Sequence, residues 1–108
     1  MSDTAPTIAR HWRGYALREN ADAYVEHLRR DTLPKLESID GFRGAYVLER
    51  DLGEEVAFVV LTLWSSLDAV RAFAGDDYET AVLPPEARRL LSRFEDTVDH
   101  FEVAVDAT

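Results

Sequence analysis

The stretch Val-Ala-Phe-Val-Val-Leu-Thr-Leu-Trp, residues 56–64, decides the fold that this sequence predicts. It is apolar at almost every position, whereas a strand with one face in water alternates apolar and polar residues. As a strand it is therefore apolar on both faces, and both faces must be covered. In a short chain with few helices, the helices cover one face and a partner covers the other. The two sets are Phe58, Val60 and Trp64 on one face, and Ala57, Val59, Leu61 and Leu63 on the other.

A second β-rich run precedes this strand and spans residues 42–50. The residues between the two runs, Asp51-Leu52-Gly53-Glu54, form a turn signal, so we predict a β-hairpin. After residue 64, Ser65 is placed to cap a second helix, with Asp68 three residues later, and Gly75 is expected to end this helix.

Apolar residues at helical spacing predict an amphipathic helix over residues 20–39, which Asp40-Gly41 ends. Pro34 has no amide hydrogen, so we expect a kink or break there. We expect His11 and His27 to face solvent.

The two ends of the chain also contain β-strand patterns. In a strand over residues 7–15, Ile8, Arg10 and Trp12 share one face. The acidic residues 76–85 are expected to form a loop or a short helical turn, residues 86–94 are helical in pattern, and residues 97–105 alternate as a last strand that contains His100.

The order βαββαβ is that of the ferredoxin-like α+β fold, with one four-stranded antiparallel sheet and helices on one face. At 108 residues the chain is expected to be a single domain, residues 1–108. The uncovered sheet face would bury several apolar side chains at about 1.5–3 kcal/mol each. We therefore expect a homodimer in which two sheets meet as an α/β barrel.

Composition excludes several classes of function. The chain has no cysteine, which excludes disulfides, thiolate metal sites and cysteine nucleophiles. A formal net charge of -9 argues against binding nucleic acid or anionic lipid surfaces. The N-terminal residues have no signal-peptide pattern and no apolar run is long enough to span a membrane, so we expect a cytoplasmic protein.

A resemblance to a known family rests on three segments: residues 8–12, Ile-Ala-Arg-His-Trp; residues 62–75, Thr-Leu-Trp-Ser-Ser-Leu-Asp-Ala-Val-Arg-Ala-Phe-Ala-Gly; and residues 98–103, Val-Asp-His-Phe-Glu-Val. Together they resemble the antibiotic biosynthesis monooxygenase family of dimeric α/β barrels. The resemblance implies two sheets laid together as a barrel, with a pocket in each subunit between sheet and helices. Some members oxidise polyketide hydroxyanthrones to quinones with molecular oxygen and no cofactor, others degrade haem, and many have no assigned activity.

Residue by residue, the resemblance carries over in part. Trp64 matches the tryptophan that closes the third strand in quinone-forming members, but Val60 and Val70 stand where those members have asparagine and tyrosine. Phe73 stands where haem-degrading members have tryptophan, and Leu83 where they have the haem-ligating histidine. The resemblance therefore disfavours haem degradation and implies no cofactor.

Cofactor-free oxygenation needs a dry aromatic pocket and a group that removes or holds a proton. We expect the substrate pocket to include Trp12, Phe58, Val60, Phe73 and Tyr78.

The candidate catalytic residues are His100 as base, Arg10 for a developing oxyanion, and Trp64. The alternatives are that Trp64 is a packing residue, that His100 pairs with Glu102 or a backbone carbonyl, and that Arg10 pairs with an acid. The acidic pairs 54–55 and 76–77 have no accompanying ligands at metal-binding spacing, so no metal site is expected.

Two functions follow. The first is a cofactor-independent monooxygenase acting on a small electron-rich aromatic, a polyphenol or hydroxyanthrone. The second is a non-catalytic dimer that binds a small apolar ligand.

Overall fold

The sheet of the protein is built from three ten-residue strands and two short ones. A computed structural model of the chain describes residues 7–107. The long strands are β1 (Ile8–Leu17), β2 (Phe42–Asp51) and β3 (Glu55–Trp64). The order across the sheet is β2-β3-β1, all antiparallel. β4 (Arg93–Phe94) and β5 (Asp99–Glu102) follow one another along the free edge of β1. The last strand, predicted over residues 97–105, is the shorter β5, whereas β4 was not predicted as a strand.

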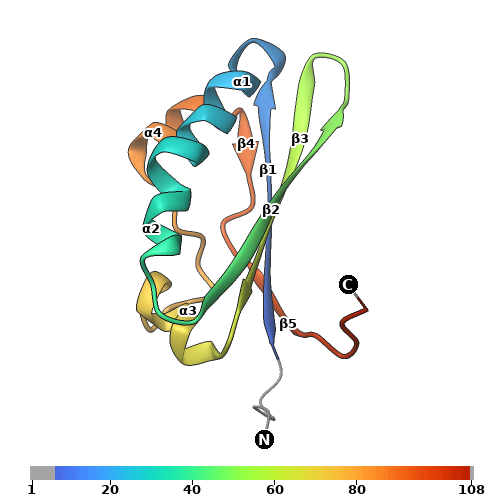
Figure 1. Cartoon of the computed structure of the whole chain (residues 1–108). Helices are drawn as coiled ribbons and strands as arrows, with labels where there is room; N and C mark the ends of the chain where they lie inside the picture. The colour runs from blue at the N-terminus through green and yellow to red at the C-terminus, as the bar shows by residue number, and fades with distance from the viewer. Residues whose placement is uncertain (1–6, 108) are drawn as a thin grey trace, which may run out of the picture.

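The helices lie together against one face of this sheet (Figure 1). α1 (Arg18–His27), the π-helix η1 (Leu28–Thr32) and α2 (Leu33–Glu37) run on from one another, and α3 (Leu67–Ala74) and α4 (Pro85–Leu90) complete the layer. The fold is therefore α+β with the predicted ferredoxin-like arrangement, and the sheet is not closed. No helix within residues 7–107 is long and apolar enough to cross a membrane.

The break that we expected at Pro34 takes the form of a π-turn. Pro34 follows η1 and stands at the start of α2, where a missing amide hydrogen costs least. The amide of Leu33 donates to the carbonyl of Leu28, five residues back. The helical segment therefore continues past the proline with one wide turn, which lies beside the cavity described below.

Three local predictions were wrong. The helix cap is Ser66, whose hydroxyl accepts from the amide of Ala69 at 3.1 Å, and not Ser65. The helix predicted over residues 86–94 ends at Leu90, because Arg93–Phe94 pairs with β1 instead. His27, expected at the surface, is 2% exposed and packs beside Tyr24.

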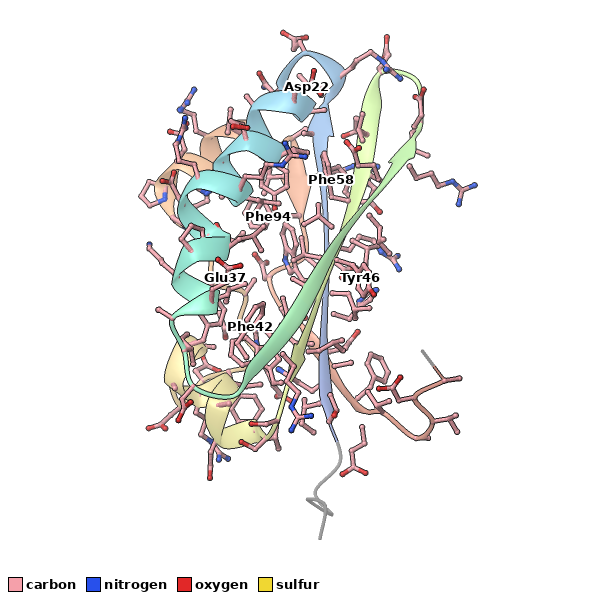
Figure 2. All side chains as sticks on the ribbon, in the orientation of Figure 1. Asp22, Glu37, Phe42, Tyr46, Phe58 and Phe94 are labelled. Carbon is pink, nitrogen blue, oxygen red and sulfur yellow. The ribbon has the colours of Figure 1, made fainter. Side chains whose placement is uncertain are left out.

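The two faces of β3 differ in burial as its pattern predicts. Phe58 and Trp64 are fully buried under the helices, whereas the opposite side chains, at 57, 59, 61 and 63, are only half-buried. Tyr46 pairs with Leu61 across the sheet and points away from the helices (Figure 2). One broad apolar face is thus left uncovered. Its most exposed large side chains are Tyr46, Leu48 and Phe101, which are 56%, 48% and 56% exposed.

Candidate functional site

A cavity of about 70 Å³ lies between the helix-facing side of the sheet and the helices. The sheet supplies Arg10, Trp12, Val60 and Thr62 to its wall. The helical segment supplies Tyr24, Leu28, Thr32 and Leu36, and the remaining wall consists of Phe73, residues 81–84, Ala87 and Val98. Most of this lining is apolar.

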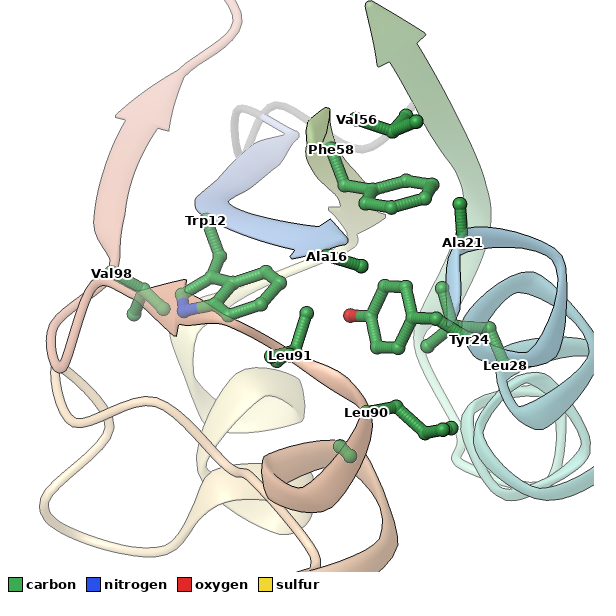
Figure 3. Close-up of a cluster of buried hydrophobic side chains, with 11 residues drawn as sticks. Trp12, Ala16, Ala21, Tyr24, Leu28, Val56, Phe58, Leu90, Leu91 and Val98 are labelled. Carbon is green, nitrogen blue, oxygen red and sulfur yellow. The ribbon is translucent and has the colours of Figure 1, made fainter. Parts of the chain in front are cut away.

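The alternation of β1 turns Arg10 and Trp12 into the cavity. The Trp12 ring lies over Gly14, where a Cβ atom would come within 2.4 Å of the ring. Its indole nitrogen donates to the carbonyl of Glu95 at 2.7 Å. Figure 3 shows the phenol of Tyr24 reaching toward this ring from α1. Burial raises the pKa of Tyr24, so its hydroxyl is neutral at physiological pH.

Arg10 is a buried cation whose contacts among the described residues include no carboxylate. It is 5% exposed. Its Nη1 donates to the carbonyl of Tyr78 and to Nε2 of His100 at 3.0 Å, and its Nη2 makes a long contact of 3.5 Å with the carbonyl of Thr80. The guanidinium carbon lies 5.7 Å from the ring centre of Phe73. Burial lowers the pKa of Arg10 to about 10, which still leaves it charged at neutral pH.

His100 lies directly across the sheet from Arg10 and does not itself line the cavity. Because a guanidinium only donates, Nε2 of His100 must accept, which places the proton of the neutral ring on Nδ1. Burial, and secondly the charge of Arg10, lower the pKa of His100 below its ordinary value. The ring packs edge-on against Tyr78 at 5.2 Å between ring centres.

Trp64 lies one layer behind the cavity wall. It is fully buried between Phe42 and Phe73, with ring centres 5.3 and 5.8 Å away. Its indole nitrogen donates to the hydroxyl of Thr62 at 2.8 Å. Trp64 therefore contacts two residues of the wall, Phe73 and Thr62, without lining the cavity itself.

A sequence model for the family described as antibiotic biosynthesis monooxygenase matches residues 11–85, which is most of the chain. The chain belongs to the antibiotic biosynthesis monooxygenase family. No curated protein matches its sequence.

Solved structures share this fold at low sequence identity. NE2512, a protein of unknown function from Nitrosomonas europaea, is 19% identical with a TM-score of 0.70, covering 98% of this chain and 97% of that one. SnoaB, a cofactor-independent oxygenase from Streptomyces nogalater, is 20% identical with a TM-score of 0.59, covering 96% and 97%. The heme-degrading protein Rv3592 from Mycobacterium tuberculosis is 22% identical with a TM-score of 0.62, covering 97% and 99%. These likenesses show a common fold and do not identify a substrate.

In this member of the antibiotic biosynthesis monooxygenase family, the predicted site residues divide into two groups. Arg10, Trp12, Val60 and Phe73 line the cavity. The others lie outside its wall: Phe58 packs against Tyr24, Trp64 lies behind Phe73, and His100 and Tyr78 lie behind Arg10. Within residues 7–107, no cluster of three or more His, Cys, Asp or Glu side chains is arranged to hold a metal ion.

Sequence reasoning predicted Arg10 but missed three other polar residues of the wall, Tyr24, Thr32 and Thr62. Thr62 has the same parity as Val60 and Trp64 on β3, so alternation alone assigns it to the helix-facing side. Tyr24 belongs to the apolar stripe of the first helix, which was read as packing. Thr32 had no signal, because it reaches the wall through the π-turn.

Proposed function

We propose that the protein is a cofactor-independent monooxygenase that oxidises a small electron-rich aromatic with molecular oxygen. The observation that carries this proposal is the buried guanidinium of Arg10 at a mostly apolar cavity. Such chemistry needs an ionised substrate in a dry pocket, because the substrate itself supplies the electrons. Family membership and the oxygenase in the name of SnoaB, which shares the fold, support the reaction class.

The reaction balances without any added reductant. For a hydroquinone, one ring C–H becomes a C–O bond and the ring is oxidised to a hydroxyquinone. One atom of molecular oxygen enters the product, and the other leaves as water with the two hydrogens that the substrate loses.

Within this proposal Arg10 stabilises the anionic oxygen of the substrate. His100 is neutral and holds the guanidinium through Nε2. Because His100 lies behind Arg10 and not in the cavity wall, its role here is to hold Arg10, and the role of general base would require the guanidinium to move aside first. Trp64 acts as a positioning residue, because it fixes the hydroxyl of Thr62 and the ring of Phe73.

The test is oxygen uptake by metal-free protein with hydroquinones, hydroxyanthrones and polyphenols. Wild-type protein is compared with Arg10→Gln and with Arg13→Gln, which removes the same charge from the opposite face of β1. We expect uptake above the uncatalysed rate that is lost in Arg10→Gln and kept in Arg13→Gln. No uptake with any substrate would instead favour a small-ligand-binding protein.

We further propose that two copies pair through the uncovered sheet face to form a homodimer. This face joins apolar side chains of β1, β2, β3 and β5, including Tyr46, Leu48 and Phe101. Left in water it would be a contiguous apolar patch. In the two-sheet barrel that the family resemblance implies, the same face of a second copy would cover this patch.

A further inference from the structure

We infer that the ligand of the cavity is a single-ring aromatic that carries an anionic oxygen, and that this oxygen binds the guanidinium of Arg10. This inference deepens the proposed function by naming a substrate class, and it rests on that proposal only for the reaction. The placement of the ligand follows from the cavity itself.

The positive charge of Arg10 has no carboxylate counter-ion among the described residues. A guanidinium carries five N–H donors, and buried charges are normally paired. Arg10 instead has two carbonyl oxygens and a neutral imidazole as its acceptors, and the contact to Thr80 is long. Other arginines pair with carboxylates at the surface: Arg18 with Asp51, Arg89 with Glu86 and Arg93 with Glu55. Arg10 is buried, so it gains more from a counter-ion than these exposed arginines do, and it lines the cavity.

The size of the cavity favours one ring. A cavity of roughly 150 Å³ binds benzene in a protein core. The cavity here is about 70 Å³, so even one ring enters only if part of the wall moves. Residues 81–84, the longest run of the wall, belong to neither helix nor strand. A fused three-ring substrate would need a far larger displacement.

A second polar group is placed to orient the same ligand. The hydroxyl of Thr62 lies in the wall and accepts from Trp64, so its own hydrogen is left to donate. The ring of the ligand then lies among Trp12, Val60 and Phe73, with its charged oxygen toward Arg10.

The experiment compares anionic and neutral probes of one shape. Benzoate, benzamide and 4-nitrophenol are titrated into the intact protein, with tryptophan fluorescence as one readout, because Trp12 lines the cavity. A second readout is the visible absorption of 4-nitrophenol, which reports its ionisation. We expect benzoate to bind at least about tenfold more tightly than benzamide, and bound 4-nitrophenol to ionise at lower pH than free 4-nitrophenol. Benzoate carries a carboxylate and ionised 4-nitrophenol a phenolate, so comparing the two shows which kind of anionic oxygen the site binds.

Variants make the result decisive. Arg10→Gln should lose the preference for benzoate, Arg10→Lys should keep part of it, and Arg13→Gln should keep all of it. Arg10→Lys preserves the buried charge, so it serves if Arg10→Gln fails to fold by circular dichroism. Equal binding of benzoate and benzamide, or a preference unchanged in Arg10→Gln, would overturn the inference. None of the three probes is a hydroquinone, so anion binding without oxygen uptake would refute the proposed function alone, and oxygen uptake without anion preference would refute this inference alone.

Discussion

The side chain of Arg10 illustrates how a β-strand pattern can conceal a site. Its position between Ile8 and Trp12 on the helix-facing side of β1 could be predicted from alternation alone. Its contacts could not, because Tyr78, Thr80 and His100 come from segments about 70 to 90 residues away in sequence. Only the folded chain shows that these contacts are neutral acceptors, which is why pairing with an acid was a reasonable alternative beforehand.

The titration of His100 gives a prediction at the same scale. Its folded-state pKa lies below the ordinary value of about 6.5, because of burial and then the charge of Arg10. As the pH falls, the imidazole of His100 therefore becomes protonated at a higher pH in the unfolded chain than in the folded protein. The stability present above about pH 6.5 should decrease as the pH drops below that value toward the lower folded-state pKa. NMR titration should find a His100 pKa below 6.5 that rises in Arg10→Gln.

The control for this titration is removal of the imidazole. In urea unfolding between pH 5 and 7.5, His100→Gln should reduce the dependence of stability on pH, while His11→Gln, on the opposite face of the sheet, should keep the part due to His100. A His100 pKa at or above 6.5 would contradict the geometry in which Nε2 accepts from Arg10.

Trp64 and Thr62 form one buried unit, and their energetics should show it. Trp64→Phe removes the indole donor and part of a filled volume, so we expect a loss of about 1–3 kcal/mol in the free energy of unfolding. Thr62→Val removes the acceptor of the same hydrogen bond. Because both changes break one interaction, the double variant should cost less than the sum of the single losses. Strict additivity in denaturant unfolding would show that the hydrogen bond contributes nothing.

At the scale of elements, hydrophobic periodicity predicted the three long strands, the hairpin and the helix ending at Gly75. It failed where a tertiary contact decides the outcome. Arg93 and Phe94 continue a helical pattern, but their backbone pairs with Gly14 and Tyr15 on the edge of β1. Thr32 reaches the cavity because of a π-turn, which no residue pattern marks. Four of the eight predicted site residues lie behind the cavity wall: Phe58, Trp64, Tyr78 and His100. A sequence pattern indicates which face of an element a residue occupies, but not how far the residue lies from a cavity.

The junction between the first helical segment and β2 gives a matched prediction at this scale. Gly41 and Gly53 have nearly the same positive φ, 96° and 95°. A Cβ atom on Gly41 would lie 2.6 Å from Oγ of Ser65 and 2.7 Å from Cβ of Ala69, whereas one on Gly53 would meet nothing within 4 Å. Gly53→Ala should cost about 1–2 kcal/mol for the backbone conformation alone. Gly41→Ala should cost clearly more in thermal or urea unfolding, and equal losses would show that Ser65 and α3 shift freely.

The whole molecule has a covered face and an uncovered one, and its chemistry depends on the covered one. Helices shield the side of the sheet that holds Arg10 and Trp12, which limits the access of water to the cavity. The other side carries apolar side chains from four strands, with a few polar ones such as Arg13 and Arg50 among them. The two-sided pattern of residues 56–64 already predicts that this side needs a partner. Burying several of these side chains at about 1.5–3 kcal/mol each is of the size needed to offset the entropy lost on association.

The uncovered face therefore predicts the mass of the particle in solution. Light scattering at micromolar concentration should give twice the 12.2 kDa of one chain. Leu48→Glu places a charge on this face, and it should cost the isolated chain little because Leu48 is 48% exposed. We expect this variant to shift the mass toward one chain while keeping the circular dichroism of the folded protein. Ala72→Glu is the control, since Ala72 is exposed on α3, on the helix side of the sheet, and this variant should remain a dimer. A wild-type mass of one chain would contradict the pairing of sheets, because the apolar face would then be stable in water without a partner.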